Sequence, residues 1–140
     1  MRMRETLGVT AREVMTEYLG AARRGDWDAA FGYFADDIVM HVPGRSEFAG
    51  ERVGKDAAVG YIQTVRSHYG EGEIELELID MLAGDDRVAL LVRERFHGRG
   101  PSVEIRRANV YRVQRDRIVE ISIFEADQYA VDELVHGGRR

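Results

Sequence analysis

The chain has 140 residues, of which 44% are hydrophobic and 32% charged, and this balance suits one folded domain spanning residues 1–140. Its formal net charge is −5, with basic and acidic residues mixed along the chain, so it lacks the concentrated basic surface that a nucleic-acid partner requires. There is no cysteine and the four histidines are far apart in sequence, so we predict no disulfide, no metal site and no cofactor. No apolar run approaches the length of a membrane span, so we expect no membrane partner and a cytoplasmic location.

Two helices are predicted in the first third of the chain. The first begins at a capping box formed by Thr10 and Glu13, carries apolar residues at helical spacing that include Tyr18, and ends at Gly25. Asp26 is a suitable N-cap for the second helix. We expect this helix to run to the acidic pair at residues 36–37, with one apolar face made of Trp27, Ala30, Phe31 and Phe34.

A strand, a loop and a third helix are predicted next. The strand begins at Ile38 and stops at Pro43, because proline cannot donate to a sheet ladder. Residues 45–53 are predicted as a loop. The third helix opens near Lys55 and closes at the glycine-rich residues 70–72, and its buried stripe is predicted at Val59, Ile62, Val65 and Tyr69.

Downstream of residue 72 the apolar pattern changes from helical to alternating spacing, which indicates strands. We predict four of them, rich in valine and isoleucine and separated by turn-like segments: Glu73–Leu82, Arg87–His97, Val103–Val113 and Ile118–Phe124. A short final helix is predicted over Ala126–Val135. Three helices followed by an antiparallel meander indicate an α+β fold.

The segment from Gly25 to Gly44, with Tyr18 before it and the four predicted strands after it, resembles the nuclear transport factor 2-like superfamily, which includes the ketosteroid isomerases and the SnoaL-like polyketide cyclases. The resemblance implies a cone in which a curved antiparallel sheet wraps around three N-terminal helices and encloses one apolar pocket. It also implies a homodimer that forms through the convex face of the sheet, and a small apolar or polycyclic ligand. What the pocket does is a separate question, because one fold carries many functions.

The ketosteroid isomerases suggest roles for three positions. Tyr18, seven residues before the pair Gly25–Asp26, matches the tyrosine that donates a hydrogen bond to the carbonyl oxygen of the substrate. Asn109 aligns with the aspartate that is the partner of this tyrosine, and an amide also offers an N–H donor. Val42 replaces the aspartate that is the general base in that family. His41 is a candidate replacement only if the strand end is twisted or bulged, because adjacent strand residues point to opposite faces.

Two other branches of the superfamily suggest different proton carriers. The SnoaL-like cyclases resemble this chain at His41–Ser46, at residues 48–50 and at Phe124–Asp132, and they use an acidic residue near the end of the last strand. Glu125 and Asp127 are both candidates for that role. Epoxide hydrolases of the limonene type use an Asp-Arg-Asp arrangement across neighbouring strands, to which this chain is weakly similar at Arg93, Glu94 and Arg95.

The resemblance and the strand pattern together give a set of candidate residues. The predicted catalytic residues are Tyr18, Asn109, His41, Asp127 and Glu125. The predicted ligand-binding residues are Trp27, Phe31, Phe34, Val42, Ile62, Arg107 and Tyr111. Each also has a structural interpretation, as a packed aromatic, a helix cap or a satisfied polar group, and Arg107 either favours an anionic or carbonyl-rich ligand or extends to solvent.

These residues favour a cofactor-independent isomerase or cyclase that acts on an apolar or polycyclic ketone by proton transfer next to the carbonyl. Two alternatives stay open. The first is a ligand-binding or assembly module without chemistry, which the valine at position 42 favours. The second is an enzyme of the epoxide-hydrolase type.

Overall fold

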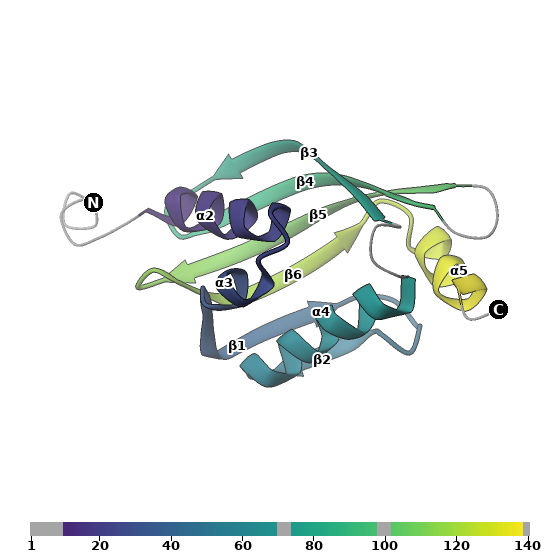
Figure 1. Cartoon of the computed structure of the whole chain (residues 1–140), viewed down its shortest axis with the longest axis horizontal. Coiled ribbons are helices and arrows are strands. Elements are labelled where there is room, and N and C mark those ends of the chain that lie inside the picture. Colours follow the sequence, from purple (N-terminus) through teal and green to yellow (C-terminus); the bar gives the residue numbers. More distant parts are fainter. Residues whose placement is uncertain (1–9, 70–73, 98–101, 139–140) are drawn as a thin grey trace.

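The computed structural model describes residues 10–69, 74–97 and 102–138. Four helices and six strands lie in these ranges, and their order confirms the predicted α+β fold (Figure 1). The elements are α2 (Ala11–Arg23), α3 (Trp27–Phe31), β1 (Phe34–Val42), β2 (Gly50–Val53), α4 (Lys55–Tyr69), β3 (Ile74–Ala83), β4 (Arg87–Phe96), β5 (Val103–Gln114), β6 (Arg117–Glu125) and α5 (Gln128–Gly138). Among the described residues, no helix is long and apolar enough to cross a membrane.

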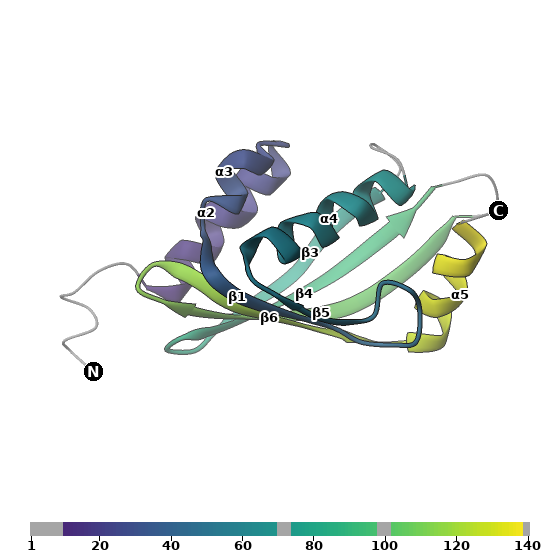
Figure 2. The same ribbon diagram turned by 90° about the horizontal axis from the view of Figure 1, so that it is seen from below.

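The six strands form one open, curved sheet in the order β2-β1-β6-β5-β4-β3. Helices α2, α3 and α4 lie on one side of it, which we call the concave face, and α5 lies at one end (Figure 2). The other side is called the outer face. The predicted meander of β3 to β6 is antiparallel throughout, whereas β1 runs parallel to β6. The connection from β1 to β6 includes β2, α4 and strands β3 to β5, and it is therefore long enough for the crossover that a parallel pair needs.

Two local predictions were wrong. The second helix ends at Phe31, and Phe34 begins β1, where it pairs with Ile118. The acidic residues 36–37, predicted as a turn, lie inside β1, at the place where the pairing register between β1 and β6 shifts. Residues 50–53 form the edge strand β2 within the predicted loop, and β2 gave no alternation signal because it has four residues and is mostly exposed.

The core lies between the concave face and the helices. The predicted stripe of α2 is confirmed, with Val14, Met15 and Tyr18 buried against the sheet. The stripe of α4 is only partly covered, because Ala58 is fully buried while Val59, Ile62 and Val65 are half-buried, and Tyr69 lies outside the side chains described.

Concave residues toward the α5 end of the sheet are also half-buried: Val42, Leu78 and Ile123. Val92 and Ile105, at the same end, are buried like Val88 and Leu90 under α2, so this end of the concave face has both buried and half-buried residues.

Candidate functional site

A cluster of charged side chains lies on the concave face of the three central strands. Arg107 of β5 pairs with Glu125 of β6 on one side and with Val92 of β4 on the other. Glu94 follows Val92 by two residues on β4 and therefore lies on the same face of the sheet. The Arg107 Nε donates to Glu125 Oε1 at 3.0 Å, and the Arg107 Nη1 is 3.6 Å from Glu94 Oε1. The exposed fractions of the side chains are only 15% for Arg107, 16% for Glu94 and 5% for Glu125. We call these three residues the acidic–arginine cluster.

Burial changes the acid–base properties of this cluster. It raises the pKa of the Glu125 carboxyl, although the charge and the hydrogen bond of Arg107 act in the opposite direction. Burial acts to lower the pKa of Arg107, but the charges of Glu94 and Glu125 outweigh it, so the pKa is raised and Arg107 stays cationic. Glu125 therefore exchanges its proton at a higher pH than an ordinary glutamate, which is the property that general acid–base catalysis uses.

A chain of neutral polar side chains lies beside the cluster. The Tyr18 ring packs on Tyr111 and Phe34, with ring centroids 5.9 and 5.8 Å apart. Burial raises the pKa of Tyr18 to about 12, and a hydrogen bond with Tyr111 acts in the opposite direction. Burial also raises the pKa of Tyr111, which is hydrogen-bonded to Asn109. The predicted donors Tyr18 and Asn109 are therefore brought together, but through Tyr111 and with their polar groups already bonded.

Asn109 has one polar atom left over. Its Oδ1 is buried and has no hydrogen-bond partner among the described residues, so the bond to Tyr111 uses the amide N–H₂ group. Asn109 follows Arg107 by two residues on the same strand face, and it is opposite Ile123, two residues before Glu125. A free acceptor thus lies next to the acidic–arginine cluster.

Tyr61 of α4 belongs to the same site and was not predicted. Burial raises the pKa of its hydroxyl, and the charges of Arg107, Glu125 and Glu94 all act on it, which places it near the cluster. Its ring is held by Arg52, 5.3 Å from the ring centroid, and by an edge contact with Phe48. The available signal was its helical spacing of four residues from Val65 on the predicted buried stripe.

Tyr61 also lines an open groove of about 440 Å³ between α4 and the segment that leads into β2. The groove is bordered by Glu47, Phe48, Arg52, Ala57, Gly60, Tyr61 and Thr64. One aromatic side chain therefore borders an accessible groove and is influenced by the charges of the buried cluster.

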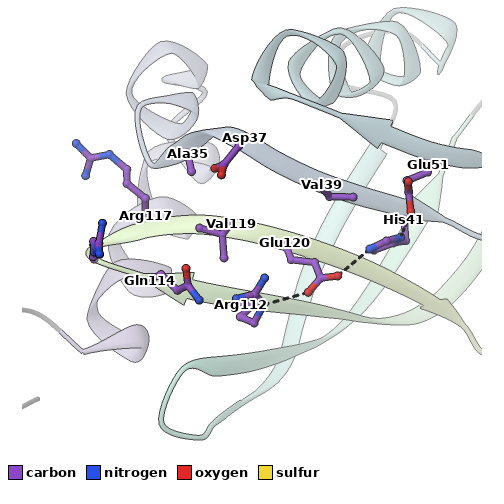
Figure 3. A pocket seen from close by; sticks show the side chains of 11 residues that line it. Ala35, Asp37, Val39, His41, Glu51, Arg112, Gln114, Arg117, Val119 and Glu120 are labelled. Atoms are coloured by element: carbon purple, nitrogen blue, oxygen red, sulfur yellow. Dashed lines mark hydrogen bonds and ion pairs between the residues drawn. The ribbon is translucent and has the colours of Figure 1, made fainter.

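The structure places His41 on the outer face, as strand alternation predicts. Its Nδ1 is 3.2 Å from Glu51 Oε2 and its Nε2 is 2.8 Å from Glu120 Oε2, while Glu120 also accepts from Arg112 Nε at 3.1 Å (Figure 3). Hydrogen bonds from His41 and Arg112 lower the pKa of Glu120. These side chains border an open pocket of about 570 Å³ that lies on the opposite side of the sheet from the acidic–arginine cluster.

Asp127 occupies a capping position. It is exposed, and its Oδ1 accepts a hydrogen bond from the backbone N–H of Ala130 at 3.1 Å, at the start of α5. Of the three acid–base candidates, only Glu125 lies on the concave face.

The predicted ligand-binding aromatics pack mostly on one another. Trp27 and Phe31, and Phe31 and Phe34, have ring centroids 5.6 Å apart, and Arg66 lies 4.6 Å above the Trp27 ring. Phe31, Phe34 and Tyr111 are buried, whereas Val42 and Ile62 are half-buried nearer the α5 end.

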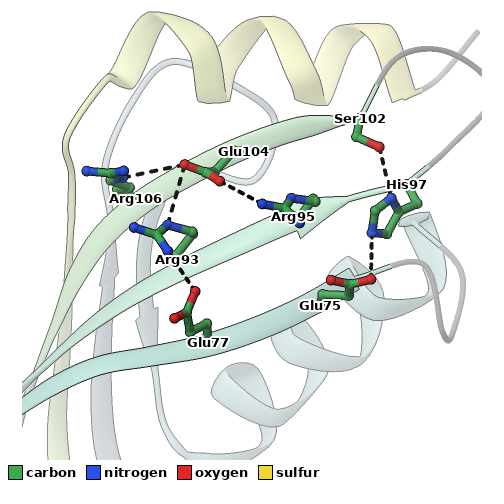
Figure 4. A network of polar contacts seen from close by, with 8 residues as sticks. All are labelled: Glu75, Glu77, Arg93, Arg95, His97, Ser102, Glu104 and Arg106. Atoms are coloured by element: carbon green, nitrogen blue, oxygen red, sulfur yellow. Dashed lines mark hydrogen bonds and ion pairs between the residues drawn. The ribbon is translucent and has the colours of Figure 1, made fainter.

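Arg93 and Arg95 do not join Glu94 on the concave face. Arg93 lies 2.7 Å from Glu77 Oε1 and 3.4 Å from Glu104 Oε2, and Arg95 lies 3.1 Å from Glu104 Oε1, all on the outer face (Figure 4). The acid–arginine–acid arrangement therefore forms across three strands, from Glu94, Arg107 and Glu125.

Comparisons with known proteins support the fold. A family model described as a SnoaL-like domain matches residues 15–121. Bal32a from a soil-derived mobile gene cassette is 25% identical, with a TM-score of 0.80 over 88% of this chain and 94% of that chain. An NTF2-like protein of unknown function from Burkholderia pseudomallei is 19% identical, with a TM-score of 0.77 over 91% and 98%. TerC, co-crystallized with polyporic acid, is 15% identical, with a TM-score of 0.76 over 90% and 98%. No curated protein sequence matches.

Proposed function

Because the chain belongs to the SnoaL-like domain family and has the NTF2-like fold, we propose that it is a small-molecule enzyme that needs no cofactor and moves a proton next to a carbonyl group. The substrate class is an apolar or polycyclic ketone, and the reaction is an isomerisation or a cyclisation. One observation carries the proposal, namely a buried glutamate with a raised pKa, Glu125, held by Arg107 on the concave face. Its position, at the end of the last strand, is one of the two at which the resemblance to the SnoaL-like cyclases suggests an acidic residue.

In the proposed step, the Glu125 carboxylate removes a proton from the carbon next to the carbonyl. The C–H electron pair forms the new C=C bond, and the carbonyl π electrons move to oxygen to give an enolate. The Arg107 charge lies 3.0 Å from the carboxylate that takes up the proton, so it is available to stabilise negative charge on either partner. The same Glu125 then returns the proton to a carbon of the product, so atoms and charge balance without a redox partner.

The experiment is exchange of the α-proton of 2-tetralone for deuterium, followed by NMR in D₂O. We expect Glu125→Gln to lower the rate by about 10²–10⁴-fold, which is the usual contribution of a positioned acid–base group. Asp127→Asn is the matched control, because Asp127 is an exposed helix cap two residues away, and it should leave the rate unchanged. Equal loss in both variants, or none in Glu125→Gln, would contradict the assignment.

Binding without chemistry is the alternative outcome of the same experiment. Polyporic acid, with which TerC was co-crystallized, is a suitable second probe. Saturable binding of either compound with no exchange between acidic and basic pH would favour a carrier or assembly module.

A second activity, epoxide hydrolysis, is favoured by one specific observation. The acid–arginine–acid arrangement of Glu94, Arg107 and Glu125 lies beside the free acceptor Asn109 Oδ1. Asn109 Oδ1 and one ionised carboxylate would hold a water; the carboxylate takes a proton from it as its oxygen attacks an epoxide carbon. The C–O bond of the epoxide breaks, and the other carboxyl, protonated, gives its proton to the leaving oxygen. Hydrolysis of cyclohexene oxide should then be lost in Glu94→Gln, and an unchanged rate would remove this version. Exchange of 2-tetralone in Glu94→Gln separates the two activities.

A further inference from the structure

One buried hydrogen-bond acceptor at the concave site, Asn109 Oδ1, has no partner among the described residues. Arg107 faces two carboxylates, Glu125 at 3.0 Å and Glu94 at 3.6 Å, so its positive charge is already matched within the cluster. Glu125 accepts a hydrogen bond from Arg107, and a carboxylate has about four lone-pair positions, so it has room for a further donor; Asn109 Oδ1 has no partner among the described residues. Asn109 Oδ1 is therefore the acceptor at this site that a ligand donor would satisfy.

The charge of the site points the same way. With both carboxylates ionised the acidic–arginine cluster carries one net negative charge, and with Glu125 protonated it is neutral. Asp132 of α5 adds a further negative influence, because its charge contributes to the raised pKa of Glu125. A ligand carboxylate placed here would meet like charge in a poorly solvated region, which is costly.

We propose that this site selects neutral ketones that carry a hydroxyl or another N–H or O–H donor close to the carbonyl, and that it rejects carboxylate-bearing ligands. The inference rests on the proposed function for the location of the reacting carbonyl, and on Asn109 Oδ1 for the specificity. An unpaired arginine in a pocket would favour an anionic ligand. Arg107 is already paired with Glu94 and Glu125, so we expect the opposite preference here.

The spacing of the two groups sets the position of the donor in the ligand. Asn109 pairs with Ile123, so Asn109 and Glu125 are diagonal neighbours across β5 and β6. Such neighbours lie roughly 7–8 Å apart between their backbones, which brings side-chain ends within reach of one small molecule. In the proposed complex, a hydroxyl on the carbon next to the carbonyl donates to the buried Asn109 Oδ1, and the proton on that carbon faces Glu125.

The experiment measures binding of four matched ligands by isothermal titration calorimetry: methyl 2-naphthyl ketone, its α-hydroxy derivative, its α-methoxy derivative and the corresponding α-keto acid. In the wild-type protein the hydroxy ketone should bind roughly tenfold more tightly than the methoxy ketone, a difference of about 1.4 kcal/mol, because only the hydroxyl satisfies the buried acceptor. The keto acid should bind most weakly.

Asn109→Leu removes the acceptor, so the ratio of the hydroxy to the methoxy dissociation constant should approach one. Asn109→Asp keeps an acceptor at nearly the same volume and should retain the preference. Ser122→Ala, a half-buried polar change on the outer face of β6, is the matched control and should leave all four affinities unchanged. Circular dichroism verifies that each variant is folded.

Equal binding of the hydroxy and methoxy ketones by the wild-type protein would overturn the inference, as would tightest binding of the keto acid or no binding of any ligand. Deuterium exchange of the bound ketones is followed separately. Hydroxyl-selective binding without exchange would support the inference and refute the proposed reaction. Exchange without a preference for the hydroxyl would support the reaction and refute the inference.

Discussion

Replacement of Arg107 by methionine is the most direct test of the acidic–arginine cluster. Methionine keeps most of the apolar stem and removes the charge that Glu125 and Glu94 share. At an effective dielectric constant of about 20, unit charges at these separations attract by roughly 4–6 kcal/mol per pair before the cost of burial is subtracted. Removing one partner of a buried ion pair typically costs about 3–5 kcal/mol, because it leaves the other charge uncompensated. We expect a loss of that size at neutral pH.

The loss should depend on pH in a defined direction. The charge and the hydrogen bond of Arg107 both act to lower the pKa of Glu125, so the variant should raise it further above its ordinary value of 4.5. The folded variant then holds a proton that the unfolded chain has released, and its stability falls as pH rises through the folded pKa. The destabilisation should therefore be smaller near pH 4.5 than at neutral pH.

Urea unfolding followed by circular dichroism and by Trp27 fluorescence measures the effect, with Arg93→Met as the matched control. Arg93 also faces two glutamates, but on the outer face and with 29% of its side chain exposed. Its loss should cost less than the loss of Arg107, because its partners Glu77 and Glu104 keep 62% and 36% of their side chains exposed and are solvated when Arg93 is removed. Equal costs for the two variants, or a cost for Arg107→Met that does not change with pH, would refute the reasoning.

Four further predictions concern stability and assembly. Gly44 has a φ of +102°, and an added Cβ would collide with Gln128 Nε2 and Asp132 Oδ1, so Gly44→Ala should lower the unfolding free energy by about 1–3 kcal/mol. Gly60→Ala, in α4 with no atom within 4 Å of the added Cβ, should be neutral or stabilising by up to about 1 kcal/mol in the same urea assay. In the wild-type protein, the contribution of protonated Glu125 to stability is present below about pH 4.5 and is lost as pH rises through its raised folded pKa, so Glu125→Gln should flatten the pH profile of thermal unfolding. We also propose a homodimer through the outer face; sedimentation velocity should show a dimer that Ala108→Glu dissociates, and a monomeric wild-type protein would count against it.

Alternation along the chain predicted most of the fold. Strands β3 to β6 begin and end within two residues of their predicted bounds, because each is long and rich in apolar residues, and β4 to β6 also bury one face. Phe31 and Phe34 were both expected on the second helix since a spacing of three residues fits a helix. The chain leaves the helix at Gly32, however, and the buried position of Phe34 is reached from a strand. Apolar spacing identifies buried residues more securely than it identifies the element that buries them.

The candidate site was only partly predictable for a related reason. Arg107, Asn109 and Tyr111 share a strand face, and this follows from their spacing of two residues. The pairing of Arg107 with Glu94 and Glu125 depends on the register between three strands, and the approach of Tyr61 depends on how α4 lies over the sheet. Local spacing determines neither the register nor the position of α4. The sequence therefore grouped Glu94 with Arg93 and Arg95, whereas in the structure it faces Arg107.

The cost of the concave polar groups is itself an argument for function. A buried ion cluster can often be replaced by apolar side chains of similar volume without loss of stability, and an unpartnered buried acceptor costs about 1–3 kcal/mol. The same sheet face is filled with apolar residues at Val88, Leu90 and Ile121, so an apolar solution at positions 107, 109 and 125 is available to this fold. The polar groups instead lie between buried residues, Leu90 and Val92, and the half-buried Val42 and Ile123. A ligand that completes the burial of those apolar side chains and supplies a donor to Asn109 would offset the cost, whereas a purely structural role leaves it unexplained.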